Sequence, residues 1–164
     1  LEVPEDGGKT SWANLQLAYE SLSDEMRIKL EDNRGEYAYN IFDVDITEEE
    51  DVQDIRTKTP DVTHPMVLTQ PRTGRKGLYF DPLQTYGIEG IAISEGHSFL
   101  EKLTAHVTRP KFIYKHVWRR GDIVLWDNCR VLHQREPFDP TVPRLMKRIT
   151  IFLPPERYPV PFVA

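Results

Sequence analysis

Residues 112–126 read FIYKHVWRRGDIVLW. The stretch contains two runs rich in aromatic and β-branched residues, which favour the pleated backbone of a strand. Gly121-Asp122 separates the runs and is typical of a tight turn. The pattern predicts strands over Phe112–Trp118 and Ile123–Trp126, and a similar run predicts another over Met146–Leu153. Beyond Pro110 the chain is therefore expected to be mostly β.

Upstream of this stretch, the sequence predicts a hairpin and a long helix. Short strand-like runs at Met66–Thr69 and Lys76–Phe80 flank Pro71-Arg72-Thr73-Gly74, which is typical of a turn. Between residues 94 and 107, apolar side chains recur at three- and four-residue spacing, which predicts a helix that ends before Pro110.

The start of the chain predicts two shorter helices. Apolar residues from Trp12 to Leu22 predict a helix over 11–21, and Ser23 is suited to cap a second helix over 23–32. The acidic segment 43–61 predicts an exposed loop or weak helix. Because helices come early and strands late, the order favours a mainly β fold with helical insertions, a β-sandwich or jelly roll, over alternating β-α-β units.

Composition restricts the classes of protein to consider. The 164 residues include 21 Lys+Arg and 26 Asp+Glu, a net charge of −5, and 39% are hydrophobic. This length and apolar content fit one globular domain. An acidic chain without a basic run is not expected to bind nucleic acid. No apolar run approaches the roughly 18 residues that cross a membrane, so no membrane partner is expected. The single cysteine, Cys129, suits a reducing compartment, and the expected location is cytoplasmic.

The common hydrolase, nucleotide-binding and zinc motifs are missing from the sequence. No two of the five histidines are spaced so that one element would present both to a metal ion. His133 is the histidine of most interest, because it follows an apolar run and a polar turn and precedes a basic segment. A structural, hydrogen-bonded role for His133 is the alternative.

Two arginines near the C-terminus indicate an anion. Side chains alternate across a strand, so Arg144 and Arg148 would share one face of the predicted strand. Two guanidinium groups on one face suit a carboxylate, with which arginine makes planar bidentate pairs. A solvated face with surface ion pairs is the alternative.

Several segments together resemble the taurine dioxygenase (TauD/TfdA-like) family, whose members depend on Fe(II) and 2-oxoglutarate. The matching segments occur in family order and span nearly the whole chain. They are Gly7-Gly8-Lys9-Thr10, Ala18-Tyr19-Glu20-Ser21-Leu22-Ser23, His64-Pro65-Met66-Val67, Pro71-Arg72-Thr73-Gly74-Arg75-Lys76 with Leu78-Tyr79, and Trp118 with Gly121-Asp122, Leu125-Trp126-Asp127-Asn128, His133, Arg144 and Lys147-Arg148.

The resemblance implies a role for five residues. His133 matches the distant histidine of the iron triad. Thr10 and Arg144 match the residues that bind the distal carboxylate of 2-oxoglutarate. Arg148 matches a second arginine, near the substrate or 2-oxoglutarate, and Gln84 stands in a loop, Asp81-Pro82-Leu83-Gln84-Thr85, that borders the substrate pocket in the family. Gln84 replaces the aromatic residue of many members, which weakens a taurine assignment.

The implied activity is oxidation, usually hydroxylation, of a small organic substrate by O2, with release of succinate and CO2. Arg148 suggests an anionic group on that substrate. The implied fold is a double-stranded β-helix (jelly roll), incomplete at its N-terminal side. The residues do not decide between a monomer and a homo-oligomer.

One part of the family pattern is missing. The family's His-x-Asp pair lies upstream of the Gly-Gly-x-Thr run, and here no histidine is followed two places later by aspartate. We therefore expect residues 1–164 to be the C-terminal portion of a single TauD-like dioxygenase domain, which would not fold stably alone. The alternative is a catalytically inactive jelly-roll binding module that lacks the His-x-Asp metal ligands.

Overall fold

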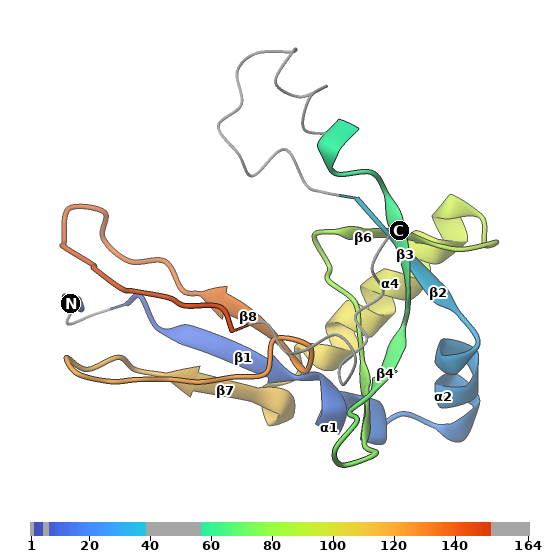
Figure 1. Cartoon of the computed structure of the whole chain (residues 1–164), viewed down its shortest axis with the longest axis horizontal. Helices are drawn as coiled ribbons and strands as arrows, with labels where there is room; N and C mark the ends of the chain where they lie inside the picture. Colours follow the sequence, from blue (N-terminus) through green and yellow to red (C-terminus); the bar gives the residue numbers. More distant parts are fainter. Residues whose placement is uncertain (1, 5–6, 39–56, 152–164) are drawn as a thin grey trace.

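The computed structural model of the chain describes residues 2–4, 7–38 and 57–151 (Figure 1). Within these ranges, strands outnumber α-helices. This confirms the mainly β prediction with helical insertions.

One sheet is centred on the first strand of the chain. Strand β1 (Thr10–Asn14) lies between β7 (Ile113–His116) and β8 (Val131–Arg135), and both pairs are antiparallel. Trp12 is the cross-strand partner of Tyr114 on one side and of His133 on the other. The sheet thus joins the start of the chain to segments that come about a hundred residues later (Figure 1).

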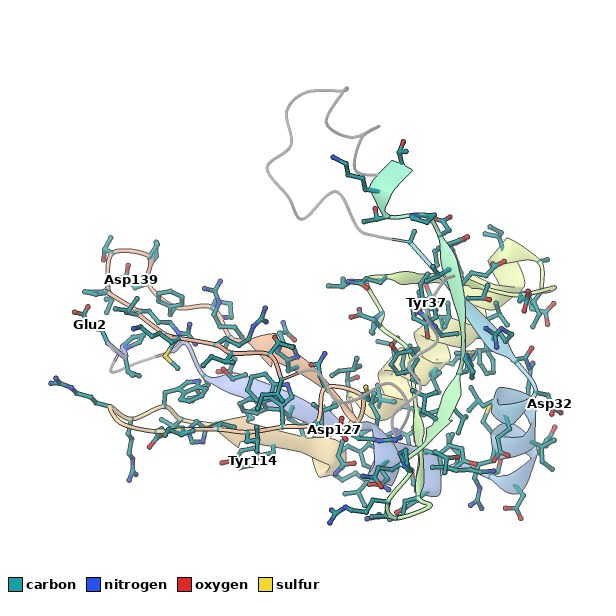
Figure 2. The ribbon with its side chains drawn as sticks, in the orientation of Figure 1. Glu2, Asp32, Tyr37, Tyr114, Asp127 and Asp139 are labelled. Atoms are coloured by element: carbon teal, nitrogen blue, oxygen red, sulfur yellow. The ribbon has the colours of Figure 1, made fainter. Side chains whose placement is uncertain are left out.

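The other half of the molecule holds a second three-stranded sheet and a two-stranded sheet (Figure 1). Strand β2 (Arg34–Tyr37) lies between β3 (Val62–Pro65) and β6 (Thr85–Ile88). Strands β4 (Val67–Thr69) and β5 (Lys76–Leu78) form an antiparallel hairpin, which confirms that prediction. In Figure 2, Tyr37 marks this half, while Glu2 and Asp139 mark the far end of the β7-β1-β8 sheet.

The helices follow the sequence signals with one correction. Helix α4 (Ile93–Val107) matches its prediction, as does α2 (Asp24–Glu31), where Ser23 Oγ accepts a hydrogen bond from the backbone N–H of Met26. Helix α1 is confined to Leu15–Glu20, so the predicted helix over 11–21 was wrong for residues 11–14.

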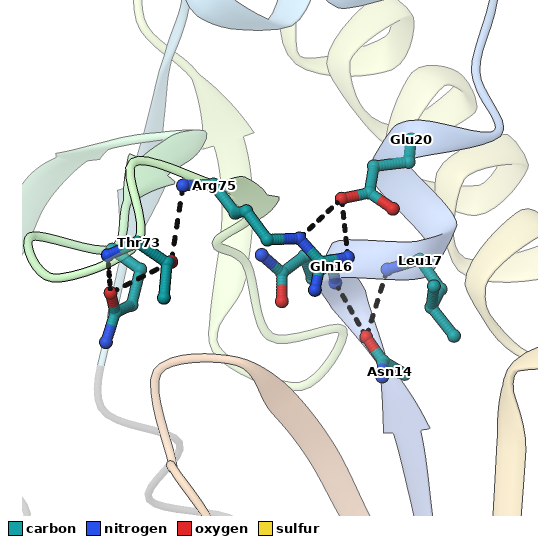
Figure 3. Close-up of polar contacts among 7 residues, drawn as sticks. Asn14, Gln16, Leu17, Glu20, Thr73 and Arg75 are labelled. Atoms are coloured by element: carbon teal, nitrogen blue, oxygen red, sulfur yellow. Dashed lines mark hydrogen bonds and ion pairs between the residues drawn. The ribbon is translucent and has the colours of Figure 1, made fainter.

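The side chain of Asn14 explains where α1 begins. Its Oδ1 accepts hydrogen bonds from the N–H groups of Gln16, at 3.1 Å, and Leu17, at 3.0 Å (Figure 3). This cap satisfies donors at the first turn, and the residues before it remain extended. Trp12 therefore packs from a strand, although its spacing from Leu15 suggested a helix.

The buried core lies among α1, α4, the β4-β5 hairpin and β6, and α4 runs beside β6 (Figure 1). A short 3-10 helix, η2 (Pro110–Phe112), follows α4 and contributes one aromatic ring. The core residues are Leu15, Ala18, Tyr19, Leu30, Met66, Leu78, Phe80, Ile88, Leu100, Leu103, Val107 and Phe112.

Two arginines fasten the β4-β5 hairpin to its neighbours. Arg75 donates from Nε and Nη2 to Glu20 Oε1 on α1, at 3.0 and 2.7 Å (Figure 3). Arg130, just before β8, donates from Nη1 to the carbonyl oxygen of Leu68 at 2.8 Å. The second contact links the hairpin to the β7-β1-β8 sheet.

Two predicted strands are absent from the described part of the chain. Residues 123–126 and 146–151 make no ladder there, and Leu145 forms a single bridge with Glu2. Exposure still alternates along the first segment, with Ile123 at 93% and Leu125 at 85% between more buried neighbours. The alternation of exposed and half-buried side chains at residues 123–126 is that of a strand. A strand also needs a hydrogen-bonding partner, which the described residues do not provide.

Some predictions fall outside the described residues. Residues 152–153 of the last predicted strand lie there, as does most of the acidic segment 43–61. Among the described residues, no helix is both long and apolar enough to cross a bilayer.

Candidate functional site

One face of the β7-β1-β8 sheet carries two of the five predicted site residues, Thr10 and His133. Side chains two apart on β1 point to the same face, and directly opposed residues of neighbouring strands share that face. Thr10 pairs with Arg135 and Trp12 with His133. On the other side, Thr10 pairs with His116. The register therefore places Thr10 and His133 on one face of the sheet.

Aromatic rings pack around Trp12 on this sheet. Trp12 is only 5% exposed, and its ring lies 5.3 Å from that of Trp126 and 6.4 Å from that of Trp118, centroid to centroid. The ring of Trp126 in turn lies 5.4 Å from His133. The cluster supplies a rigid apolar support beside two of the predicted site residues.

Thr10 is a buried polar residue whose hydroxyl oxygen accepts a hydrogen bond. Its side chain is 8% exposed, and its Oγ1 accepts a hydrogen bond of 2.9 Å from the indole N–H of Trp118. A role was predicted for Thr10 from the sequence, whereas Trp118 was predicted only as the end of a strand and as part of a family-like segment. Trp118 is half-buried and contacts the candidate site directly.

Arg144 lies against the chain two residues before Thr10. Its Nη2 donates to the carbonyl oxygen of Gly8 at 3.3 Å, and its Nε is buried without a hydrogen-bond partner among the described residues. Burial, and then the charge of Arg135, lower the pKa of Arg144. Both guanidinium groups lie over the ring of Phe138, at 5.7 Å for Arg144 and 4.9 Å for Arg135. Two converging cations, one of them partly desolvated, favour binding of an anion.

The charges of two residues, Arg148 and Asp81, act on the pKa of His133. Partial burial of its ring lowers the pKa of His133, the charge of Arg148 lowers it further, and the charge of Asp81 opposes both effects. Arg148 is exposed, and neither Arg148 nor Arg144 lies in a strand of the described residues. The prediction that the two arginines share one strand face was therefore wrong. The charge of Arg148 still disfavours the protonated form of His133.

Gln84 lies in the turn between β5 and β6. Its backbone N–H donates to the carbonyl oxygen of Asp81 at 3.1 Å, and its own carbonyl accepts from Ala38 N at 3.0 Å. The side chain of Gln84 is exposed. Within this turn, the charge of Asp81 raises the pKa of His133, an effect that was not predicted from the sequence.

The described residues do not form a complete metal site. Among them, no group of three or more His, Cys, Asp or Glu side chains could hold a metal ion. His133 is therefore at most one ligand of such a site. One imidazole is too few to hold iron, which family members bind through two histidines and a carboxylate.

Two other histidines, His106 and His64, make structural contacts away from this sheet. His106 Nε2 lies 3.0 Å from the carbonyl oxygen of Ala18, and its ring packs on Phe112. His64 packs between the rings of Tyr37 and Tyr79.

Comparison with known proteins supplies independent evidence. The model of the family described as "Taurine catabolism dioxygenase TauD, TfdA family" matches residues 1–150. The alpha-ketoglutarate-dependent 2,4-dichlorophenoxyacetate dioxygenase of Burkholderia sp. (strain RASC) is 35% identical over 152 residues, covering 92% of this chain and 50% of that protein. Pentalenolactone F synthase of Streptomyces arenae is 34% identical over 160 residues, covering 91% and 54%. The chain thus spans about half the length of the curated relatives it matches.

Solved structures agree with the sequence matches. The crystal structure of AAD-2 in complex with Mn(II) and N-oxalylglycine superposes with a TM-score of 0.79 at 32% identity, covering 89% of this chain and 57% of that one. A taurine dioxygenase from Burkholderia xenovorans gives a TM-score of 0.69 at 31% identity, covering 84% and 43%.

Proposed function

We propose, because this chain belongs to the taurine catabolism dioxygenase TauD, TfdA family, that it forms the co-substrate-binding part of an Fe(II)- and 2-oxoglutarate-dependent oxygenase. We assign the full-length protein the double-stranded β-helix fold of that family. In this proposal, residues 1–164 are the C-terminal portion of that domain. Because the chain spans about half of its relatives, the activity proposed here is that of the full-length protein.

The observation that carries the proposal is the environment of Arg144. Its guanidinium is held by Gly8 O and Phe138, yet Nε is buried without a partner among the described residues. Thr10 adds a buried hydroxyl two residues from Gly8. A cation and a hydroxyl in a partly desolvated site are suited to a carboxylate, and the distal carboxylate of 2-oxoglutarate is the proposed ligand.

Iron would take His133 as one ligand, with the other ligands coming from outside the described residues. When bound, iron supplies the oxygen chemistry, in which 2-oxoglutarate and O2 are converted to succinate and CO2 while the substrate is oxidised. The contribution of the described residues is to hold 2-oxoglutarate through Thr10 and Arg144. They also fix the ring of His133 against Trp126.

A small anionic organic molecule is the proposed substrate. Relatives are named for 2,4-dichlorophenoxyacetate and for sulfate esters, and both are anions. Arg148 supplies a cation whose charge lowers the pKa of His133, and we assign this cation to the anionic group of the substrate. Gln84 and the turn that begins at Asp81 border the same region in the proposed arrangement.

The test uses the full-length protein with Fe(II), 2-oxoglutarate, O2 and a panel of aryloxyacetates and alkyl sulfates. Succinate formation and loss of the organic acid are measured together. Arg144→Gln should raise the KM for 2-oxoglutarate on the order of a hundredfold, because an ionic pair with a carboxylate is lost. Arg148→Gln should mainly raise the KM for the organic acid. Binding of 2-oxoglutarate without any succinate formation would contradict the oxygenase and support an inactive binding module.

A further inference from the structure

The contact between Trp118 and Thr10 joins two residues that are 108 positions apart in the sequence. The indole Nε1 lies 2.9 Å from Thr10 Oγ1, and Thr10 is 8% exposed. This length is that of a well-formed hydrogen bond. The contact lies on the strand whose preceding loop holds Arg144 through Gly8.

The direction of this hydrogen bond limits what the threonine hydroxyl can do. An indole N–H can only donate, so Thr10 Oγ1 must be the acceptor. The hydroxyl keeps one hydrogen of its own, and none of the hydrogen bonds in the described part of the chain uses it as a donor. Trp118 thus occupies one acceptor position of Thr10 and leaves the O–H available for a second, electron-rich partner.

Neighbouring groups fix the orientation of Trp118. Its ring meets that of His116 edge to face, with centroids 4.6 Å apart and an interplanar angle of 80°. His116 Nε2 lies 2.9 Å from Asp122 Oδ2, and the same carboxylate oxygen accepts the N–H of Arg119 at 2.9 Å. His116 is also the cross-strand partner of Thr10. The turn 119–122 therefore fixes the indole relative to β1.

We propose that Trp118 is a positioning residue for the co-substrate: its N–H orients the hydroxyl of Thr10 so that this hydroxyl donates to the distal carboxylate of 2-oxoglutarate. This inference rests on the proposed function. It adds a residue, Trp118, that acts on the co-substrate through its hydrogen bond to Thr10. The expected consequence is an effect on 2-oxoglutarate affinity that depends on the distal carboxylate.

The test compares Trp118→Phe with the unaltered full-length protein. Phenylalanine keeps an aromatic ring but removes the N–H. The KM for 2-oxoglutarate should rise on the order of tenfold, because a hydrogen bond to a charged group is misaligned, while kcat changes less than twofold. Use of 2-oxobutanoate, a 2-oxo acid without the distal carboxylate, should be unchanged. Tyr19→Phe is the matched control, since it removes one aromatic hydroxyl contact, to Glu31, and should leave both KM values unchanged.

A double variant makes the test independent of a general loss of fold. Thr10→Val should raise the KM for 2-oxoglutarate as much as Trp118→Phe or more, and adding Trp118→Phe to it should change nothing further. If Trp118→Phe does not fold, Asp122→Asn, which loosens His116 and the indole, should raise the same KM two- to threefold.

Three results would overturn the inference. These are an unchanged KM for 2-oxoglutarate in Trp118→Phe, an equal rise for both 2-oxo acids, or additive effects in the double variant. In the case where Trp118→Phe does not fold, an unchanged KM in Asp122→Asn overturns it as well. If the unaltered protein does not use 2-oxoglutarate at all, the proposed function itself fails, and this inference fails with it.

Discussion

The Nε atom of Arg144 lies 3.2 Å from the position that a Cβ atom would take on Gly8. Gly8 has φ +61°, a backbone conformation that side chains disfavour. Its carbonyl oxygen also accepts the hydrogen bond from Arg144 Nη2. Glycine at this position therefore serves two purposes, since it allows the turn before β1 and leaves room for the guanidinium.

Gly8→Ala should lower the affinity for 2-oxoglutarate while the protein still folds. The methyl group would press on Arg144 and on Pro4 Cγ, also 3.2 Å away, and so displace the guanidinium. Gly74→Ala is the matched control, because Gly74 has a similar φ of +68° but no atom within 4 Å of the added carbon. The KM for 2-oxoglutarate should rise on the order of tenfold in Gly8→Ala only. Equal KM values in the two variants would contradict this explanation.

Arg130→Met should destabilise the protein by about 1–3 kcal/mol, since the carbonyl oxygen of Leu68 loses its donor in a partly buried place. The side chain of Arg130 is only 12% exposed. Arg75→Met, which removes the exposed pair with Glu20, should cost about 0–1 kcal/mol. Urea unfolding of both variants measures the difference. A larger loss for Arg75→Met would show that the surface pair, and not Arg130, holds the hairpin.

Leu78→Ala should be among the most damaging core substitutions. Leu78 lies on β5 with none of its surface exposed, and truncation would leave a cavity costing about 2–5 kcal/mol. Leu83→Ala removes the same atoms from a residue that is 70% exposed and should change stability by less than about 0.5 kcal/mol. Thermal melting of the two variants checks the contrast. Similar melting temperatures would mean that β5 does not pack into the core as described.

Tyr19 should make the protein sensitive to alkali. Burial, and then its hydrogen bond to Glu31, raise the pKa of Tyr19 from 10.0 to about 12. The folded state therefore holds this proton more tightly than the unfolded state, so the associated stability is present below pH 10 and is lost as the pH rises to 12. In Tyr19→Phe the free energy of unfolding should fall less steeply between these values. Parallel pH curves for the two proteins, from urea titrations at several pH values, would contradict the assignment.

Local patterns predicted the elements whose evidence lies within one segment. Helix α4 and the β4-β5 hairpin formed as expected, because helical spacing and a turn motif act over a few residues. Residues 123–126 have the alternating exposure of a strand but lack a partner in the described part of the chain. Strand pairing depends on distant residues, and periodicity carries no information about them.

The candidate site was predictable to a similar extent. Residue type and the family resemblance selected Thr10, His133 and Arg144, and the sheet register places the first two on one face. The partner of Thr10 was missed because the Trp118 contact spans 108 residues and leaves no local pattern. Asp81 was missed for the same reason, since its effect on His133 also acts across the fold.

The central position of β1 also has a consequence for synthesis on the ribosome. Strand β1 is complete at Asn14, but its two neighbours end at His116 and Arg135. At translation rates of about 5–20 residues per second, β1 leaves the ribosome on the order of 10 s before its second neighbour exists. Through that interval both of its edges offer unpaired N–H and C=O groups to other chains. The strand that carries Thr10 is thus made long before its partners, so a nascent chain completes the sheet face that carries Thr10 and His133 only after Arg135 has been synthesised.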